Sequence, residues 1–250
     1  MSIPVDKLLK AFPDTKQYRV RCTFHEPVLG TAPKNKEVYA KYIQSKALDL
    51  VQKTEVAGVD AGAQAALATT AEEIDEEVNT VPTAEDIENK GWTGFHEDEG
   101  GVFLYNYVIK GFCKEAASTM NRLPETETKK IKAFLKTIDA LLFVKPRRIH
   151  ILFNDKPIFS DDKDGPIVPL ERALRVKTPQ GERVTLARSD TVPEGSTIEF
   201  EILCLGVVST AILEEWLNYG MWRGLGQWRN AEYGAFTHEI EEIKASPKPK

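Results

Sequence analysis

Few cysteines and histidines limit the chemistry that this chain can carry. Its 250 residues include three cysteines and four histidines. Cys22, Cys113 and Cys204 lie far apart in the sequence, each within an apolar pattern, so their spacing fits neither a disulfide framework nor a metal site. We interpret them as small buried hydrophobic residues in a reducing compartment. We therefore predict a cytoplasmic protein with no metal and no cofactor.

Long apolar runs and an excess of positive charge are also missing. No segment approaches the roughly 20 apolar residues of a membrane span, and the amino terminus lacks the apolar region of a signal peptide, so we expect no membrane partner. The net charge of −5 at pH 7 and the pI of 5.6 exclude a generally basic nucleic-acid coat. Many of the aspartate and glutamate residues lie in residues 53–101, which we predict to be an acidic flexible insertion with helical pieces. The rest of the chain is correspondingly more basic.

The most informative segment runs from Gly220 to Phe236 and is rich in glycine, arginine and aromatic residues. This composition suits a nucleic-acid backbone, because glycines allow close approach to phosphate, guanidinium groups bind phosphate and flat rings stack on bases. Apolar spacing predicts a helix at 209–219 and a strand at 233–240. A dinucleotide-binding loop needs the strand before the glycines and the helix after them, so the order excludes that function.

Alternating apolar residues predict half-buried strands at 18–24, 149–153 and 198–204. Helical spacing predicts helices at 37–52, 104–120 and 128–143. The sequence Pro179-Gln180-Gly181 predicts a turn that joins strands at 170–178 and 182–189 into a hairpin. We expect Leu174, Val176, Val184 and Leu186 to share one side of this hairpin and its cations to lie on the other. The order of elements is compatible with an α+β fold that has a ferredoxin-like (RRM-like) antiparallel sheet core.

One family resemblance follows from these motifs. The Val192-Pro193-Glu194-Gly195 turn, the following strand, the leucine-rich helix and the loop that closes on Tyr233-Gly234-Ala235-Phe236 resemble the carboxy-terminal half of the RAMP superfamily, the RNA-binding proteins of CRISPR systems. The segment Tyr107 to Ala116 is similar to a variant of that superfamily's Pro-Gly-Ser-Ser-Leu-Lys-Gly segment, in which only Lys110 and Gly111 match. The repeating backbone subunits are the most similar members.

This resemblance implies a single domain over residues 1–250. Within it we predict the acidic insertion, a projecting basic β-hairpin at 170–189 and a disordered tail at 243–250. The resemblance also implies non-catalytic binding of single-stranded nucleic acid, with RNA favoured over DNA. The subunit would assemble along the strand as a homo-oligomer or within a multi-subunit ribonucleoprotein. A phage or mobile-element relative of a CRISPR system would fit the same pattern.

The candidate contacts to this strand are the cations and aromatic rings of the motifs above. They are Arg19, Arg21, Lys110, Lys114, Arg147, Arg148, Arg172, Arg175, Lys177, Arg183, Arg188, Trp222, Arg223, Trp228 and Arg229. Two alternatives apply to the last segment: Trp222 and Tyr233 could be core residues beside a tight turn, and Arg229 could pair with a carboxylate.

Two other functions stay open. His25 directly follows the first predicted strand and could act as a general base in a metal-independent RNA endonuclease. No aspartate occurs between His25 and Lys36, which argues against metal-assisted cleavage there. The second alternative is a protein-interaction subunit without nucleic-acid binding.

Overall fold

The structure is a computed structural model that describes residues 15–34, 92–178, 181–206 and 208–243. The chain divides into two compact units. The first unit comprises Met1–Val28, Phe103–Ile158 and Pro193–Lys250, and the second comprises Leu29–Val102 and Phe159–Val192. The predicted helix at 37–52, most of the acidic insertion and the tail from residue 244 lie outside the described residues. The predicted α+β class agrees with the mixed antiparallel sheets and few helices of the described part.

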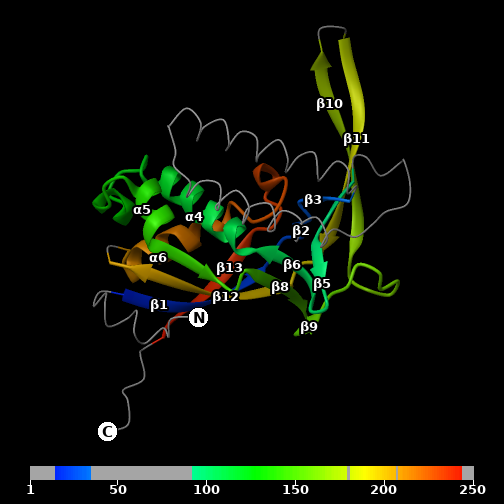
Figure 1. The fold of residues 1–250 in the computed structure, drawn as a ribbon. Helices are drawn as coiled ribbons and strands as arrows, with labels where there is room; N and C mark the ends of the chain where they lie inside the picture. Colours follow the sequence, from blue (N-terminus) through cyan, green and yellow to red (C-terminus); the bar gives the residue numbers. More distant parts are fainter. Residues whose placement is uncertain (1–14, 35–91, 179–180, 207, 244–250) are drawn as a thin grey trace, which may run out of the picture. The chain divides into compact units, whose positions relative to one another are not determined.

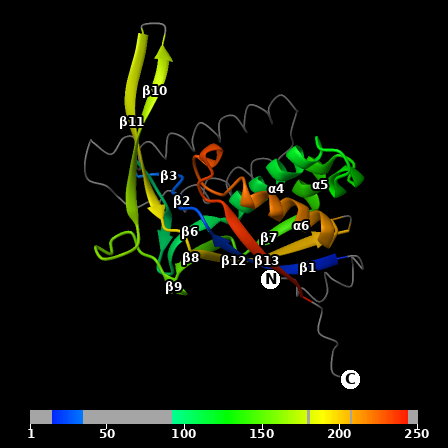
Figure 2. The same cartoon turned by 180° about the vertical axis from the view of Figure 1, so that it is seen from behind.

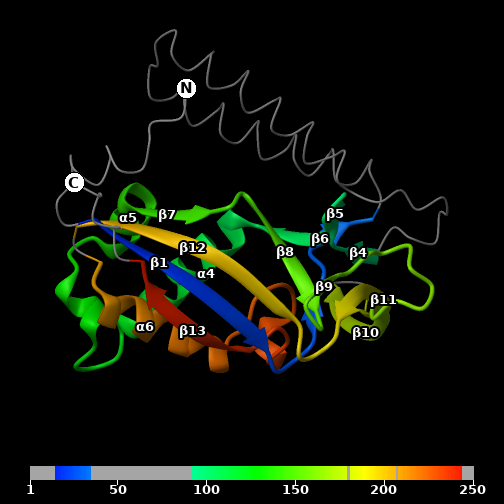
Figure 3. The same cartoon turned by 90° about the horizontal axis from the view of Figure 1, so that it is seen from below.

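The first unit is built on one antiparallel sheet (Figures 1 and 3). Its strands run in the order β13 (Phe236–Glu242), β1 (Thr15–Phe24), β12 (Thr197–Leu205), β8 (Arg148–Phe153) and β6 (Gly101–Tyr105), of which β6 enters this unit at Phe103. The short strand β9 (Lys156–Pro157) pairs with β8. Strand β1 is antiparallel to both of its neighbours, so the first and last described strands of the chain lie side by side at one edge of the sheet.

Alternation of apolar residues fixes which face of this sheet is buried, as the sequence predicts. Along β12, the side chains of Ile198, Phe200, Ile202 and Cys204 are buried. Along β1, the same holds for Tyr18, Val20, Cys22 and Phe24. All three cysteines are free and buried, which confirms their interpretation as core residues. Burial raises the pKa of the Cys113 and Cys204 thiols to about 12.

Two helices cover the buried face of the sheet (Figure 1). They are α4 (Asn106–Met120), which follows β6, and α6 (Thr210–Asn218), which follows β12. The hydroxyl of Ser209 caps α6 by accepting a hydrogen bond from the backbone N–H of Ile212 at 3.4 Å. The four residues predicted to form the apolar stripe of α6 are all buried: Ile212, Leu213, Trp216 and Leu217. The helix-before-strand order around the glycine-rich segment is confirmed.

The helix predicted at 128–143 is the main error in the secondary structure. Residues Glu127–Lys130 form a 3₁₀ turn, α5 covers only Phe134–Leu141, and Leu142–Lys145 form strand β7. Ala133 has φ of +49°, a left-handed conformation that a continuous helix cannot contain. The helix predicted from residue 104 likewise begins only at Asn106, because Leu104 and Tyr105 belong to β6.

The second unit contains the predicted hairpin, seen with its two strands side by side in Figure 2. Its strands are β10 (Val168–Thr178) and β11 (Gly181–Val192), which are longer than predicted at the base of the hairpin. Strand β11 also pairs with β4 (Trp92–Gly94) and with β2 (Val28–Leu29), and β4 pairs with β3 (Ala32–Pro33). Strand β4 and the following β5 (His96–Asp98) occupy the end of the segment predicted as a flexible insertion.

The register of this hairpin contradicts the predicted division into an apolar side and a cationic side. Arg175 pairs with Val184, and Val176 pairs with Arg183. Directly opposed residues of an antiparallel ladder share a face. Each face of the hairpin therefore carries both cationic and apolar positions. The prediction placed the two strands out of step by one residue, which exchanges the faces of one strand.

Candidate nucleic-acid interface

A groove of about 860 Å³ opens in the first unit where the start of α4 meets β7 and β12. Its walls combine cationic, anionic and aromatic side chains. The lining residues are Arg19, Asn106, Tyr107, Lys110, Leu142, Phe143, Val144, Lys145, Pro146, Arg147, Glu199, Phe200 and Glu201. Three of the predicted contacts, Arg19, Lys110 and Arg147, are brought together here from segments distant in the sequence.

A bulge in the sheet shapes this groove. Lys145 of β7 pairs with Glu201, and Ile151 of β8 pairs with Ile198, so both strands share one edge of β12. Five residues lie between Lys145 and Ile151, whereas two lie between Ile198 and Glu201. The surplus forms a corner at Pro146 and Arg147, both exposed, after the cis Lys145–Pro146 peptide bond. Such bulges redirect side chains away from the regular pleat.

The first residue of α4 ties the helix to this corner. The backbone N–H of Asn106 donates to the carbonyl oxygen of Arg147 at 2.8 Å. The side-chain Nδ2 of Asn106 donates to the carbonyl oxygen of Val144 at 2.9 Å. These two hydrogen bonds hold the first turn of α4, with Tyr107 and Lys110, beside the exposed residues of β7.

Two exposed aromatic rings belong to the groove, and the sequence analysis missed both as contacts. The side chain of Tyr107 is 51% exposed and stacks on the buried Tyr105 ring, with centroids 5.3 Å apart and an angle of 14°. Phe143 is 41% exposed, and the Nζ atom of Lys110 lies 5.6 Å from its ring centroid. In β7, Phe143 and Lys145 are exposed while Leu142 and Val144 are buried. That alternation was the available signal, and the helix assignment obscured it.

The groove has more cations than carboxylates, although the whole chain is acidic. Arg19, Lys110, Lys145 and Arg147 line it together with Glu199 and Glu201. Arg19 lies 3.9 Å from Glu201, a long ion pair. Lys145 is exposed and forms no ion pair with any residue that the structure describes. Positive charge is therefore concentrated locally, as binding to phosphate requires.

Lys110 is the most enclosed of these cations. Its ammonium group donates to the carbonyl oxygen of Asp139 in α5 at 2.9 Å. Burial lowers the pKa of Lys110, the nearby Asp139 carboxylate raises it, and Lys114 lowers it. Lys114, which follows Lys110 by one helical turn, was also predicted to contact the nucleic acid. It forms an ion pair with the Asp139 carboxylate instead and does not line the groove.

On the exposed face of β1, at the edge of the groove, carboxylates lie opposite both predicted arginines. The register places Arg19 between Glu201 of β12 and Glu241 of β13, and Arg21 between Glu199 and Glu239. Arg21 pairs with Asp155 at 3.0 Å and with Glu199 at 3.4 Å. Carboxylates therefore flank both predicted arginines on either side, a pattern that stabilises neighbouring strands but repels phosphate.

The two arginines of the glycine-rich turn, residues 219–235, are bound by one carboxylate of α4. The Nε of Arg223 pairs with Glu115 of α4 at 2.6 Å, and Arg229 pairs with the other oxygen of the same carboxylate. Arg223 also donates to the side chain of Asn230. One carboxylate thus holds two guanidinium groups, and the alternative in which Arg229 pairs with a carboxylate is the one observed.

The glycines of this turn serve close internal packing. A Cβ atom on Gly224 would lie 2.0 Å from the carbonyl carbon of Gly234, and one on Gly234 would lie 2.0 Å from the carbonyl oxygen of Leu225. The N–H of Leu225 donates to the carbonyl of Gly234, and the N–H of Gly234 donates to that of Pro27. These N–H groups therefore have protein partners and are not directed at a phosphate.

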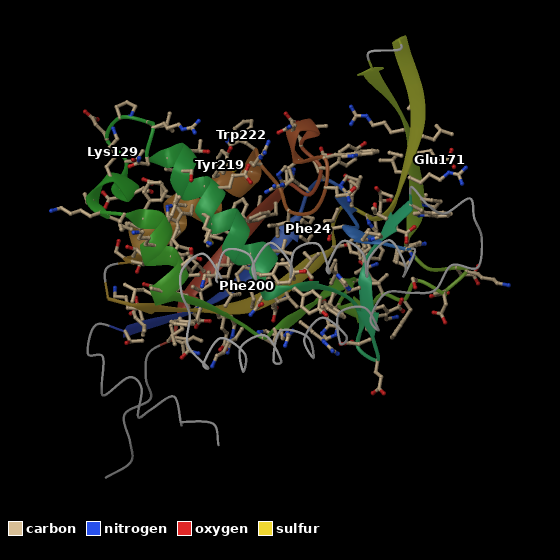
Figure 4. All side chains as sticks on the ribbon, turned by 45° about the horizontal axis from the view of Figure 1, so that its top comes forward. Phe24, Lys129, Glu171, Phe200, Tyr219 and Trp222 are labelled. Atoms are coloured by element: carbon tan, nitrogen blue, oxygen red, sulfur yellow. The ribbon has the colours of Figure 1, made fainter. Side chains whose placement is uncertain are left out.

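The aromatic residues of the turn lie in different environments. Trp222 follows the carboxyl end of α6 near Tyr219 and is 72% exposed, so it is not a core residue (Figure 4). Trp228 packs edge-on against Tyr233, with ring centroids 6.0 Å apart, and both are partly buried. The structure thus keeps Trp222 accessible for stacking and gives Trp228 and Tyr233 an internal contact.

The remaining predicted cations include one in the first unit and five in the second. In the first unit, the guanidinium carbon of Arg148 lies 5.4 Å from the Phe103 ring centroid. In the second, Arg188 pairs with Glu171 at 2.8 Å and lies 5.8 Å from the Trp92 ring centroid. Arg172 is exposed. The side chains of Arg175, Lys177 and Arg183 lie outside the described part of the chain.

His25 is exposed at the end of β1, and its backbone N–H donates to the carbonyl of Ala235 at 3.0 Å. Within the described ranges, no group of three histidine, cysteine or acidic residues is arranged to hold a metal ion. No helix in those ranges is both long enough and apolar enough to cross a membrane.

Comparison with known proteins gives low-identity structural matches. No protein-family model and no curated protein sequence matches this chain. A chain of the cryo-EM structure of the Type III-B Cmr-beta bound to cognate target RNA is 15% identical, with a TM-score of 0.47 over 96% of this chain. A chain of a Type IV-B CRISPR complex is 9% identical, with a TM-score of 0.41 over 94% of this chain and 95% of that one. This protein spans 64% of the length of the first of these chains.

Proposed function

We propose that the protein binds single-stranded nucleic acid, preferably RNA, in the groove between α4, β7 and β12. The observation that carries this proposal is the local excess of cations beside two exposed rings, Tyr107 and Phe143, in a chain that is acidic overall. A single strand offers phosphates to the cations and unpaired bases to the rings. A duplex buries its bases in the stack and could use only the cations.

We also propose that the first unit has a ferredoxin-like core and acts as a subunit of a CRISPR-type ribonucleoprotein. The strand order β13-β1-β12-β8 supports the ferredoxin-like assignment, because in the chain α4 lies between β1 and β8 and α6 lies between β12 and β13. The RAMP resemblance of the sequence supports assembly along a guide strand, as a homo-oligomer or with other subunits. Under this proposal the protein is a binder and not an enzyme, and His25 has no catalytic role.

The other predicted contacts remain proposals of lower priority. They form two sets, the hairpin cations of the second unit and the side chains Arg21, Lys114, Arg148, Trp222, Arg223, Trp228 and Arg229 of the first. Several of these already have internal partners, as described above. Trp222 is exposed, so it is the best candidate for an additional stacking contact.

The double variant Lys145→Ala/Arg147→Ala tests the groove. We expect its Kd for a fluorescein-labelled oligo(U) strand, measured by anisotropy, to rise by about tenfold or more, because two charge-assisted contacts are lost. The slope of log Kd against log salt should fall by about 1.4, since each phosphate contact on a single strand contributes about 0.7.

Lys129→Ala/Lys132→Ala is the matched control. It removes the same formal charge from two exposed positions beyond the carboxyl end of α4, outside the groove (Figure 4 labels Lys129). Its Kd should change by less than about twofold. Equal weakening in both double variants would show that only net charge matters and would remove the groove from the proposal.

A further inference from the structure

Two carboxylates in a cationic groove need an explanation, because each one repels the phosphates that the groove is proposed to bind. Glu201 has one within the protein. Its Oε2 accepts a hydrogen bond from Gln17 Nε2 at 2.8 Å, its Oε1 lies 3.9 Å from Arg19, and it pairs in register with Lys145. Glu201 therefore organises three strands of the sheet.

Contacts within the protein explain the presence of the Glu199 carboxylate in the groove less well. Its side chain is 52% exposed, and its contact in the described part of the chain is Oε1 to Arg21 Nη1 at 3.4 Å. Arg21 has a shorter partner in Asp155 at 3.0 Å. Glu199 thus lines the groove while its carboxylate has acceptor capacity beyond this one long ion pair.

A carboxylate can only accept hydrogen bonds, so it selects ligand groups that donate them. On an unpaired strand those donors are the ribose 2′-hydroxyl and the N–H groups of the bases. The hydroxyl occurs on every ribonucleotide, whatever its base, and it is the group that distinguishes RNA from DNA. The repulsion from phosphate is then offset on a strand that supplies this hydroxyl and is uncompensated on a strand that lacks it.

We propose that Glu199 is a specificity residue that accepts a hydrogen bond from a ribose 2′-hydroxyl and so makes the groove prefer RNA. This inference rests on the proposed function and assigns the sugar discrimination to one side chain. It does not require base recognition, so the preference for ribose should be the same on strands of different sequence.

The test compares oligo(U) with the same strand carrying 2′-fluorine, which removes the hydroxyl donor while keeping the RNA-like sugar shape. Wild-type protein should bind the hydroxyl strand about three- to tenfold more tightly, the range expected for one net hydrogen bond that replaces hydrogen bonds to water. Glu199→Ala should bind both strands equally, with a tighter Kd for the fluorinated strand than wild type, because a negative charge is gone. Glu199→Gln, which keeps a carbonyl acceptor, should retain part of the ratio.

Glu239→Ala is the control, since Glu239 lies on the same sheet face but does not line the groove. It should keep the wild-type ratio, and urea unfolding should confirm that every variant is folded. A wild-type ratio of one, or an unchanged ratio in Glu199→Ala, would overturn the inference while leaving binding itself intact. A ratio that changes with the base, in oligo(U) against oligo(C), would overturn it in favour of base reading. Failure of wild type to bind either strand would instead refute the proposed function.

Discussion

The groove beside α4 and the glycine-rich turn contain similar kinds of residue, cations and aromatic rings, but they differ in where those residues find partners. In the turn, Arg223 and Arg229 share Glu115, and the glycines allow two stretches of backbone to touch. In the groove, Lys145 and Arg147 are exposed at a bulge of the sheet, and the guanidinium carbon of Arg147 lies 5.9 Å from the Tyr105 ring centroid. The comparison teaches that a nucleic-acid-like composition is also what a tightly packed turn requires, so composition alone does not identify the binding surface.

The largest expected difference between the two regions is in stability. Gly234→Ala should lower the free energy of unfolding by about 2–4 kcal/mol, because φ is +72° and the new Cβ would meet the Leu225 carbonyl oxygen at 2.0 Å. Urea denaturation would measure this change. The folded fraction should still bind oligo(U) with nearly the wild-type Kd.

Gly111→Ala is the control for that variant. Gly111 lies in α4 next to the groove residue Lys110, and a Cβ there would meet nothing within 4 Å. Alanine should raise stability by up to about 1 kcal/mol through its higher helix propensity. If Gly234→Ala were as stable as wild type but failed to bind RNA, the turn and not the groove would be the phosphate site.

A smaller effect is expected at Glu115, the α4 carboxylate that binds both arginines of the turn. Glu115→Gln should lower stability by about 1 kcal/mol, because two partly buried guanidinium groups lose their shared anion. The affinity for oligo(U) should stay within about twofold of wild type. Exposed Glu26→Gln, with the same change of charge, provides the baseline for both measurements. A clear gain of affinity limited to Glu115→Gln would mean that the freed arginines reach phosphate.

The smallest effect concerns pH and sharpens the account of the groove. Because burial lowers the pKa of Lys110, this side chain loses its charge at a lower pH than an exposed lysine. The affinity for oligo(A) should therefore fall by about two- to fivefold as the pH rises from about 7 to about 9.5. Anisotropy titrations would measure this decline. Lys110→Arg keeps its charge throughout and should bind with a flatter pH profile, so an equally steep profile in that variant would exclude Lys110 as the titrating group.

Much of the sheet of the first unit could be predicted from the sequence because its signals are local. Alternation in β1 and β12 and helical spacing in α6 depend only on which residues contact the core. The helix predicted at 128–143 was wrong because helical spacing of apolar residues continues across the left-handed Ala133 and into strand β7, at Ile131, Phe134, Leu135, Ile138 and Leu142. A short apolar run of this kind fits either period.

The groove was only partly predictable because it depends on pairing between distant segments. The sequence identifies Arg19, Lys110 and Arg147 as cations, but only the register shows that Glu201 and Glu241 flank Arg19. In the same way, nothing near Arg223 in the sequence indicates that Glu115, more than 100 residues away, accepts its guanidinium group. A cation predicted from sequence as a phosphate contact must therefore be checked for carboxylates that the fold places beside it.

The corner at Pro146 and Arg147 also offers a place to change ligand preference without rebuilding the sheet. Strand β12 pairs with Lys145 before the corner and with Ile151 after it, so β12 supplies a frame on both sides. The exposed side chains of Pro146 and Arg147 could be exchanged to move positive charge along the groove. Libraries randomised at this one corner would therefore sample new strand preferences on an unchanged scaffold.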